Sequence, residues 1–536
     1  SATVQLRIDL GFDEQFVRKQ FAPVRVDVAG LLGPVQGRLV VLEDVGQDMR
    51  SPQTLSYELA AGTIHDGVYE ATLPIYDPVL PLEARLLDSD GRVLAAESKN
   101  VRLFAREEPF PVVAGAVLRF RATESLVDPE DLPRDWWAYS GVKALWIASP
   151  NVEQTRWTAI AEWALSGGSV VICTGSDFYQ LDSPLVRSLL PLALPALYEA
   201  PSGTQYLTGS LRPGARTLLE RDSVPLLVRR PYGAGNVYVV TCRAADLDET
   251  DIDRLAASIL PSSRISSMDQ FLKESVAETR VLRPVYVSAP LIGLLCTATL
   301  FLFHRIAKRR FVTGAVVLGL CITAVSVSFA FYTNWAGHIG FVHHVATVFS
   351  IQTDVGIDIA SDGIYALRPL ALTVDQPRAS YPLDLEYRTL ASAVIATDGV
   401  LDATSFGLPA GRLLRFRTAS EAQSPLEVAA TSDTVTVVHH AESESSAVLL
   451  VLDGRYYSVG RLGPGTSVLR RDALQPVSAS SMKPVERSLY RCVSDWLPTQ
   501  GMTWIVARFE SQRDIVSGPF TGRERVITVV VTGASS

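Results

Sequence analysis

The sequence predicts a multidomain membrane protein in which a β-sandwich, a parallel α/β sheet, two transmembrane helices and a β-rich domain follow one another. Apolar and polar residues alternate in the first hundred residues, continuous apolar runs follow, and two long uncharged segments come next. The expected parts, in chain order, are a sandwich at 1–106, an α/β domain at 110–262, a helical linker at 263–284, a transmembrane helix at 285–303, a loop at 304–310, a second transmembrane helix at 311–332, a juxtamembrane segment at 333–353 and a β-rich domain at 354–536.

Half-buried strands are predicted for residues 1–106. Val4, Leu6 and Ile8 alternate with polar neighbours, and similar patterns recur further along. Successive side chains of a strand point to opposite faces, so this period of two places one face in a core and the other in water. Turn signals such as Asp66-Gly67 and Asp90-Gly91 separate the strands. Together these features favour an immunoglobulin-like sandwich.

Residues 110–262 change to continuous apolar runs, which are typical of strands buried on both faces of a parallel sheet. Two such runs are 144–148 and 169–174. A helix is expected between them, because Ser149-Pro150 is a good helix start and Gly167-Gly168 a good stop. Strand, helix and strand in this order predict a parallel α/β sheet.

Two uncharged apolar segments, 285–303 and 311–332, predict a transmembrane hairpin. At about 1.5 Å per helical residue, each segment can cross a hydrocarbon core of about 30 Å. An exported amino-terminal half needs a targeting segment, and no charged, then apolar, segment opens this chain. We therefore expect that such a segment was removed before Ser1.

The charges around the hairpin predict its topology. Four cations fall in the short loop between the two apolar segments, whereas the stretch after Tyr332 has none until Arg368. The positive-inside rule places the loop in the cytoplasm and both large flanking regions in the periplasm, outside a bacterial inner membrane. The topology determinants are Arg305, Lys308, Arg309 and Arg310.

Residues 354–536 are expected to be rich in strands, with apolar runs at 434–438, 447–452 and 526–531. One amphipathic helix interrupts them, and Pro484 suits its first turn. Its apolar stripe consists of Val485, Leu489, Cys492, Val493 and Trp496.

The composition excludes several classes of function. A net charge of -8 argues against a nucleic-acid partner, which would need a basic face. The five cysteines are an odd number without metal-type spacing, so neither a disulfide framework nor a metal site is expected. A bridge between Cys173 and Cys242, on two neighbouring strands, stays open. Nothing in the sequence implies a cofactor.

Three short motifs in the middle region carry a family resemblance. Residues 139–147, 163–172 and 232–237 resemble a degenerate class I glutamine amidotransferase-like domain of a group of bacterial membrane proteins. That group places this domain between an immunoglobulin-like sandwich and a membrane hairpin, and a β-rich domain follows. Residues 460–465 are similar to the Gly-x-Leu-x-Pro-Gly turn of that last domain. The resemblance therefore covers nearly the whole chain.

The resemblance does not extend to a complete catalytic triad. Active members of the wider class carry a cysteine at a Gly-x-Cys-x-Gly elbow, together with a histidine and an acid. Residues 171–175 keep Cys173 and Gly175 but lack the first glycine, and no histidine occurs from 66 to 303. Because a cysteine nucleophile needs a base that holds it as a thiolate, we expect a buried structural Cys173 and no enzyme activity.

A ligand crevice is predicted at one edge of the parallel sheet. Ligands of such sheets bind outside the carboxyl ends of the strands, where this chain has Asn151, Asp177 and Arg243. The alternative is that these three residues only cap helices and shape loops.

Three further motifs have structural interpretations. The segment 232–236 leads into a strand and not a helix, so it predicts a β-turn and no nucleotide loop. The segment 88–91 fits a hairpin turn better than a calcium loop. The pairs His343-His344 and His439-His440 lie in strands, where adjacent side chains face opposite ways, so neither pair is expected to chelate a metal.

The leading functional hypothesis is a non-catalytic, membrane-anchored envelope scaffold or complex subunit. Its partners would be other membrane or envelope proteins, bound through the extracytoplasmic domains, and the lipid bilayer itself. Two alternatives remain, namely a Cys-dependent amidase or amidotransferase that uses Cys173, and an envelope protein that binds glycans.

Overall fold

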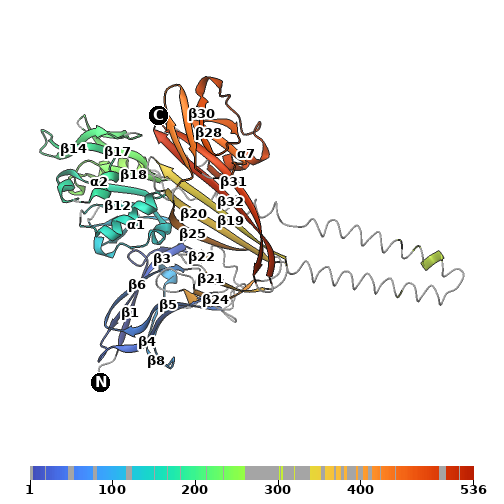
Figure 1. Ribbon diagram of the computed structural model, residues 1–536. Helices are drawn as coiled ribbons and strands as arrows, with labels where there is room; N and C mark the ends of the chain where they lie inside the picture. Colours follow the sequence, from blue (N-terminus) through green and yellow to red (C-terminus); the bar gives the residue numbers. More distant parts are fainter. Residues whose placement is uncertain are drawn as a thin grey trace.

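A computed structural model describes most of the chain (Figure 1). The described residues are 4–259, with short gaps at 19, 46–52, 76–80, 116–123, 150, 166, 182, 213, 222 and 233–234; a few positions between 298 and 319; and segments of 339–535. Only the backbone is described from 339 to 422.

The amino-terminal part is a sandwich of two antiparallel sheets. One sheet has the order β1-β3-β6, and the other has the order β5-β4-β7-β8, with a short strand β23 added beside β5. Leu6 and Ile8 are buried while Gln5 and Arg7 are exposed, as the alternation predicts. The bounds are β1 Gln5–Leu10, β3 Gln20–Ala29, β4 Val35–Val45, β5 Gln53–Ile64, β6 Gly67–Ile75, β7 Leu82–Asp88, β8 Val93–Lys99 and β23 Val394–Ile395.

The middle part is built on a seven-stranded sheet with the order β11-β10-β12-β13-β18-β17-β16. The first five strands pair in parallel, and β17 and β16 extend the sheet as antiparallel strands. The bounds are β10 Phe110–Ala114, β11 Ser125–Val127, β12 Val142–Ile147, β13 Ser169–Cys173, β16 Arg216–Arg221, β17 Val224–Tyr232 and β18 Gly235–Val240. Tyr232 pairs with Gly235, so the glycine motif closes a hairpin, as predicted.

Helices cover both faces of the parallel sheet, and this is why its strands are apolar throughout. Helix α1, Gln154–Leu165, packs Trp157 and Ile160 on one face. Helix α3, Glu249–Ser258, packs Leu255 on the other. Helix α1 begins at Gln154, later than the predicted start at Ser149. Helix α2 and a two-stranded ribbon lie between β13 and β16, with bounds α2 Pro184–Leu189, β14 Leu192–Glu199 and β15 Gln205–Leu211.

The carboxyl-terminal part contains an eight-stranded sheet with the order β22-β25-β20-β19-β32-β31-β28-β29. Its long strands form one extended sheet, drawn in yellow to red (Figure 1). Strand β19, Ile339–Ile351, lies inside this sheet and pairs in parallel with β32, Phe520–Ser535. The sheet therefore takes in residues that the sequence assigns to the juxtamembrane segment. The other bounds are β20 Gly356–Ala366, β22 Ser380–Pro382, β25 Leu413–Ala422, β28 Ala447–Leu452, β29 Arg455–Gly460 and β31 Met502–Ser517.

Smaller elements complete this part, among them the predicted amphipathic helix. Helix α7, Pro484–Val493, buries Leu489 and Val493 of the predicted apolar stripe, whereas Val485 is 38% exposed. The Cys492 side chain and Trp496 lie outside the described residues. Glu486 accepts hydrogen bonds from Ser458 Oγ (2.6 Å) and from the backbone N–H of Lys483 (3.0 Å), and it thereby caps the helix start. The remaining strands are β21 Leu370–Asp375, β24 Asp402–Leu408, β26 Leu426–Ala430, β27 Thr434–His439 and β30 Gly465–Arg470.

The predicted transmembrane helices are contradicted. A helix needs about 20 residues to cross the apolar part of a bilayer. The longest helix of the described residues is α1, with 12, and no described helix is long and apolar enough to span a membrane. Residues 285–303 and 311–332 lie almost entirely outside the described residues.

The expectations that depended on those helices are withdrawn with them. These are the membrane part of the fold class and the location at a bacterial inner membrane. The lipid bilayer as a partner stays a prediction. The topology assigned to the cations of the loop at 304–310 loses its basis for the same reason. Arg305 is exposed, and Lys308, Arg309 and Arg310 lie outside the described residues.

Close packing at the β17–β18 hairpin gives a test of the fold. A side-chain carbon at Gly235 would overlap the carbonyl oxygens of Gly168 and Ala164, which are backbone atoms that cannot move aside. Gly235→Ala should therefore lower the free energy of unfolding by about 1–3 kcal/mol. Urea denaturation followed by tryptophan fluorescence measures this loss. Gly33→Ala is the matched control, because nothing lies within 4 Å of a carbon added there. Equal stability of the two variants would contradict the packing.

Candidate functional site

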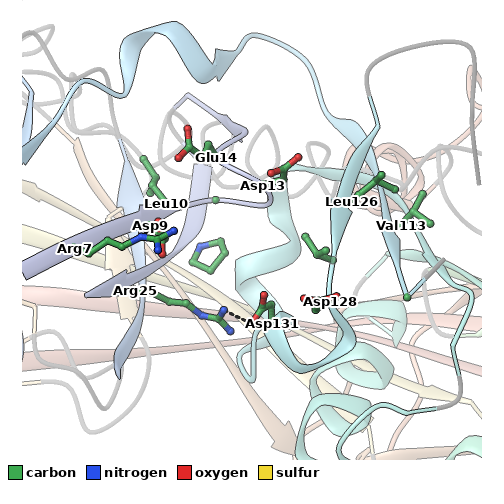
Figure 2. A pocket seen from close by; sticks show the side chains of 14 residues that line it. Arg7, Asp9, Leu10, Asp13, Glu14, Arg25, Val113, Leu126, Asp128 and Asp131 are labelled. Carbon is green, nitrogen blue, oxygen red and sulfur yellow. Dashed lines mark hydrogen bonds and ion pairs between the residues drawn. The ribbon is translucent and has the colours of Figure 1, made fainter. Parts of the chain in front are cut away.

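A pocket of about 540 Å³ lies between the sandwich and the α/β sheet (Figure 2). One wall comes from β1, β3 and the turn after β1, and the other from the ends of β10 and β11 and the loop that follows β11. The lining residues that carry charge are Arg7, Asp9, Asp13, Glu14, Arg25, Asp128 and Asp131. The pocket thus lies at the carboxyl end of the parallel strands, the edge where such sheets bind ligands.

A tight turn presents two of the acidic side chains. The backbone N–H of Phe12 donates to the carbonyl of Gln15 (2.8 Å), and the N–H of Gln15 donates to the carbonyl of Phe12 (2.9 Å). Asp13 and Glu14 between them have φ of +48° and +64°. Turns with a left-handed backbone at both central positions usually have the sequence Asn-Gly. Any other residue held in that conformation costs about 1–3 kcal/mol of folding free energy. The turn therefore holds two carboxylates at the pocket although Asp and Glu prefer a backbone with negative φ.

Phe12 anchors this turn in the neighbouring unit. Its ring centroid lies 6.4 Å from that of Phe110 and 5.8 Å from that of Tyr139, within the core of the α/β sheet. The buried Ser125 hydroxyl donates to the Phe12 carbonyl (2.7 Å). One residue of the sandwich is thus held by both packing and a hydrogen bond, and the adjacent Asp13 has a defined position.

Further contacts join the two walls. Arg25 of β3 forms ion pairs with Glu70 (2.9 Å) and with Asp131 of the other wall. Thr72 donates a hydrogen bond to Asp135 (2.9 Å). Burial raises the pKa of the Asp135 carboxyl, and the hydrogen bond from Thr72 acts in the opposite direction. The sandwich and the α/β sheet are thus joined by these contacts, and both contribute residues to the pocket.

The pocket carries an excess of negative charge. Arg7 pairs with Asp9 (3.4 Å), and Lys99 pairs with Glu14 (2.7 Å). Asp13 and Asp128 have no ion-pair partner among the residues that the structure describes. Two carboxylates from opposite walls are therefore available to a cationic group.

The predicted crevice residues lie at the same sheet edge but outside this pocket. Asn151, Asp177 and Arg243 follow β12, β13 and β18, which are neighbours in the sheet. Arg243 forms two hydrogen bonds with Asp246 (both 3.1 Å); these, with the charge of Asp246 and then that of Asp177, raise its pKa. Asn151 is exposed, and its N–H donates to Ser149 Oγ (3.3 Å). Ligand binding by these three residues stays a prediction.

The acidic residues of the pocket were missed in the sequence. Their only signal is that two short acidic stretches, Asp13-Glu14 and 128–131, each lie in a turn or loop. Such stretches usually form solvated surface, so nothing in either one indicates that the other lies opposite.

Cys173 is a buried residue of the parallel sheet, and its structural role stays a prediction. It ends β13, is 8% exposed and packs in an apolar cluster with Cys242, and both thiols are free. Burial, and then the neighbouring Cys242, raises the pKa of Cys173. Burial raises the pKa of Cys242 to about 12. A raised pKa is the opposite of what activates a thiol.

Comparisons with known proteins reveal no family. No family model and no curated protein matches the chain. One solved structure with local similarity is the exo-beta-1,4-mannosidase Op5Man5 from Opitutaceae bacterium strain TAV5. It shares 15% identity over 33% of this chain and 41% of its own, with a TM-score of 0.21. A likeness this weak carries no argument about function, and the resemblance to amidotransferase-like domains stays a prediction.

The buried thiols predict slow chemistry in the folded protein. At pH 8, iodoacetamide should modify Cys173 and Cys242 rapidly only after unfolding, which peptide mass mapping detects. Above pH about 8.5 the unfolded chain releases the thiol protons that the folded chain retains. The free energy of unfolding should therefore fall as pH rises from about 8.5 towards the Cys242 pKa of about 12. Rapid modification of Cys173 in the native state would instead indicate an activated nucleophile.

Proposed function

We propose that this chain is a non-catalytic binding protein whose acidic pocket receives a basic side chain of a partner protein. The observation that carries the proposal is the pair of carboxylates, Asp13 and Asp128, which line one pocket from two folded units and lack an ion-pair partner among the described residues. A lysine or arginine from another protein would supply the missing charge.

The dimensions of the pocket suit such a ligand. Sites for small groups usually enclose about 300–1,000 Å³, and this pocket of about 540 Å³ falls within that range. Leu10, Val127 and Pro23 provide apolar surface for the methylene stem of a long basic side chain. The carboxylates would then meet the charged end, and opposite charges across an interface increase both specificity and the rate of association.

The strained turn supports a binding role for this site. Left-handed Asp13 and Glu14 cost free energy that a more ordinary turn sequence would avoid. Such cost is found where a particular side-chain placement matters, as at ligand clamps. Here it sets two carboxylates at the rim of the pocket.

The alternatives receive less support. A Cys-dependent amidase would need an activated thiol, and Cys173 is buried with a raised pKa. A glycan site would be expected to offer an aromatic face to a sugar ring, and the residues that line this pocket include none.

Binding of a short fluorescent oligolysine peptide tests the proposal. The full chain should bind this peptide, and the double variant Asp13→Asn/Asp128→Asn should bind it roughly tenfold more weakly, as expected from the loss of two charge-assisted contacts. Fluorescence anisotropy measures the affinity, which should also fall as salt rises.

A matched control removes the same charge elsewhere. Glu199 and Glu442 are exposed and lie outside the pocket. Glu199→Gln/Glu442→Gln should leave the affinity within about twofold of the parent, because only distant, screened charges change. If both double variants weaken binding equally, the peptide reports net charge alone and the pocket is not the site.

A further inference from the structure

Two arginine side chains converge on the carboxyl end of helix α2. Arg212, which follows β15, donates from Nη2 to the carbonyl oxygen of Arg187 (3.2 Å) and from Nε to that of Leu192 (3.4 Å). Arg230, on β17, donates from Nη1 to the carbonyl oxygen of Ser188 (2.8 Å). Because Arg187 and Ser188 are consecutive residues, the two guanidinium groups are neighbours although they come from different elements.

This pair of positive charges lacks a balancing carboxylate. Neither Arg212 nor Arg230 forms an ion pair with any residue that the structure describes. Both side chains are half-buried, where water screens charge less than at an open surface. Burial, and then the charge of Arg212, lowers the pKa of Arg230. The two cations therefore repel each other, and a bound anion would relieve that repulsion.

Capping of α2 accounts for only part of this arrangement. The carboxyl end of a helix carries roughly half an elementary negative charge, so two guanidinium groups leave about 1.5 positive charges uncompensated there. Each guanidinium also has five N–H donors in a planar fork. The hydrogen bonds to carbonyl oxygens use two donors of Arg212 and one of Arg230. Positive charge and N–H donors are thus both left over.

We propose that Arg212 and Arg230 form a binding site for a phosphate dianion, either free or as the phosphoryl group of a phosphomonoester. Such a group carries a charge of about -1.5 to -2 at pH 7, which matches the two cations. Its tetrahedral oxygen atoms can accept from both forks at once, and arginine forks bind phosphate through paired hydrogen bonds. A carboxylate has one charge and two oxygen atoms, which a single guanidinium satisfies.

This site is separate from the acidic pocket. Neither Arg212 nor Arg230 lines that pocket, and the two sites take ligands of opposite charge. The phosphate site therefore does not depend on the proposed function, and a chain that fails to bind oligolysine could still bind phosphate.

Isothermal titration calorimetry of the full chain at constant ionic strength tests the site. Inorganic phosphate and O-phosphoserine are titrated separately, and acetate is the monoanion for comparison. We expect at least one phosphate compound to bind, with acetate roughly tenfold weaker because it cannot bridge both forks. Tighter binding of inorganic phosphate would assign a free ligand, and tighter binding of O-phosphoserine would assign a phosphomonoester.

Substitutions locate the binding. Arg212→Gln/Arg230→Gln should weaken phosphate binding roughly tenfold or more, through the loss of charge-assisted hydrogen bonds. Arg212→Lys/Arg230→Lys keeps both charges but loses the forks, so its affinity should be intermediate. The control is Arg92→Gln/Arg455→Gln, which removes the same charge from two exposed positions elsewhere. It should stay within about twofold of the parent, because only distant, screened charges change.

A measurement on the wild-type chain avoids any effect of the substitutions on folding. Phenylglyoxal modifies accessible arginines, and peptide mass mapping follows each one. Phosphate should slow the modification of Arg212 and Arg230 but not that of the exposed Arg92.

Four results would overturn the proposal. These are no binding of either phosphate compound, acetate binding as tight as phosphate binding, a control double variant that loses as much affinity as Arg212→Gln/Arg230→Gln, and no phosphate protection of Arg212 and Arg230 from phenylglyoxal. Circular dichroism and thermal unfolding of each variant establish that the fold is retained.

Discussion

The burial of Phe12 in the core of the α/β unit is the contact on which the arrangement of the amino-terminal half depends. Phe12 follows the first strand of the sandwich, yet its ring packs beside Phe110 and Tyr139 of the neighbouring unit. Its carbonyl also accepts the Ser125 hydrogen bond. The two walls of the pocket belong to different sheets, and the packing of Phe12 joins them together with the Arg25–Asp131 ion pair. The pocket is the space that remains between these two walls.

The same insertion explains how an unfavourable turn persists. Full burial of a phenylalanine side chain contributes about 1.5–3 kcal/mol, and a left-handed acidic residue costs about 1–3 kcal/mol. Two such residues, Asp13 and Glu14, together cost about 2–6 kcal/mol, so burial of Phe12 offsets part of this strain. Gly11 contributes as well: its φ is +74°, and a side-chain carbon there would overlap the carbonyl of Gln15. Both the burial of Phe12 and the conformation of Gly11 therefore support the turn.

Electrostatics then determine the character of the pocket. Arg25 is 22% exposed and is shared between Glu70 of the sandwich and Asp131 of the loop after β11, so it orients the two units. Fully exposed ion pairs contribute little, and partial burial makes this pair more effective than most. Since Arg7 and Arg25 are both engaged by carboxylates, the remaining acidic groups leave the pocket negative.

The sequence by itself determined the local structure of the first two units. Alternation places Leu6 and Ile8 in a half-buried strand, and the continuous apolar runs around α1 indicate a parallel sheet covered on both faces. These patterns are read correctly because strand and helix periods act over a few neighbouring residues. The transmembrane helices, which rest on the same kind of local pattern, are contradicted, and Val485 of the predicted α7 stripe is exposed. Only the tertiary structure brought Asp13 and Asp128 to one pocket. They lie more than a hundred positions apart, and no local sequence period records the tertiary contacts, among them the burial of Phe12, that bring them to one pocket.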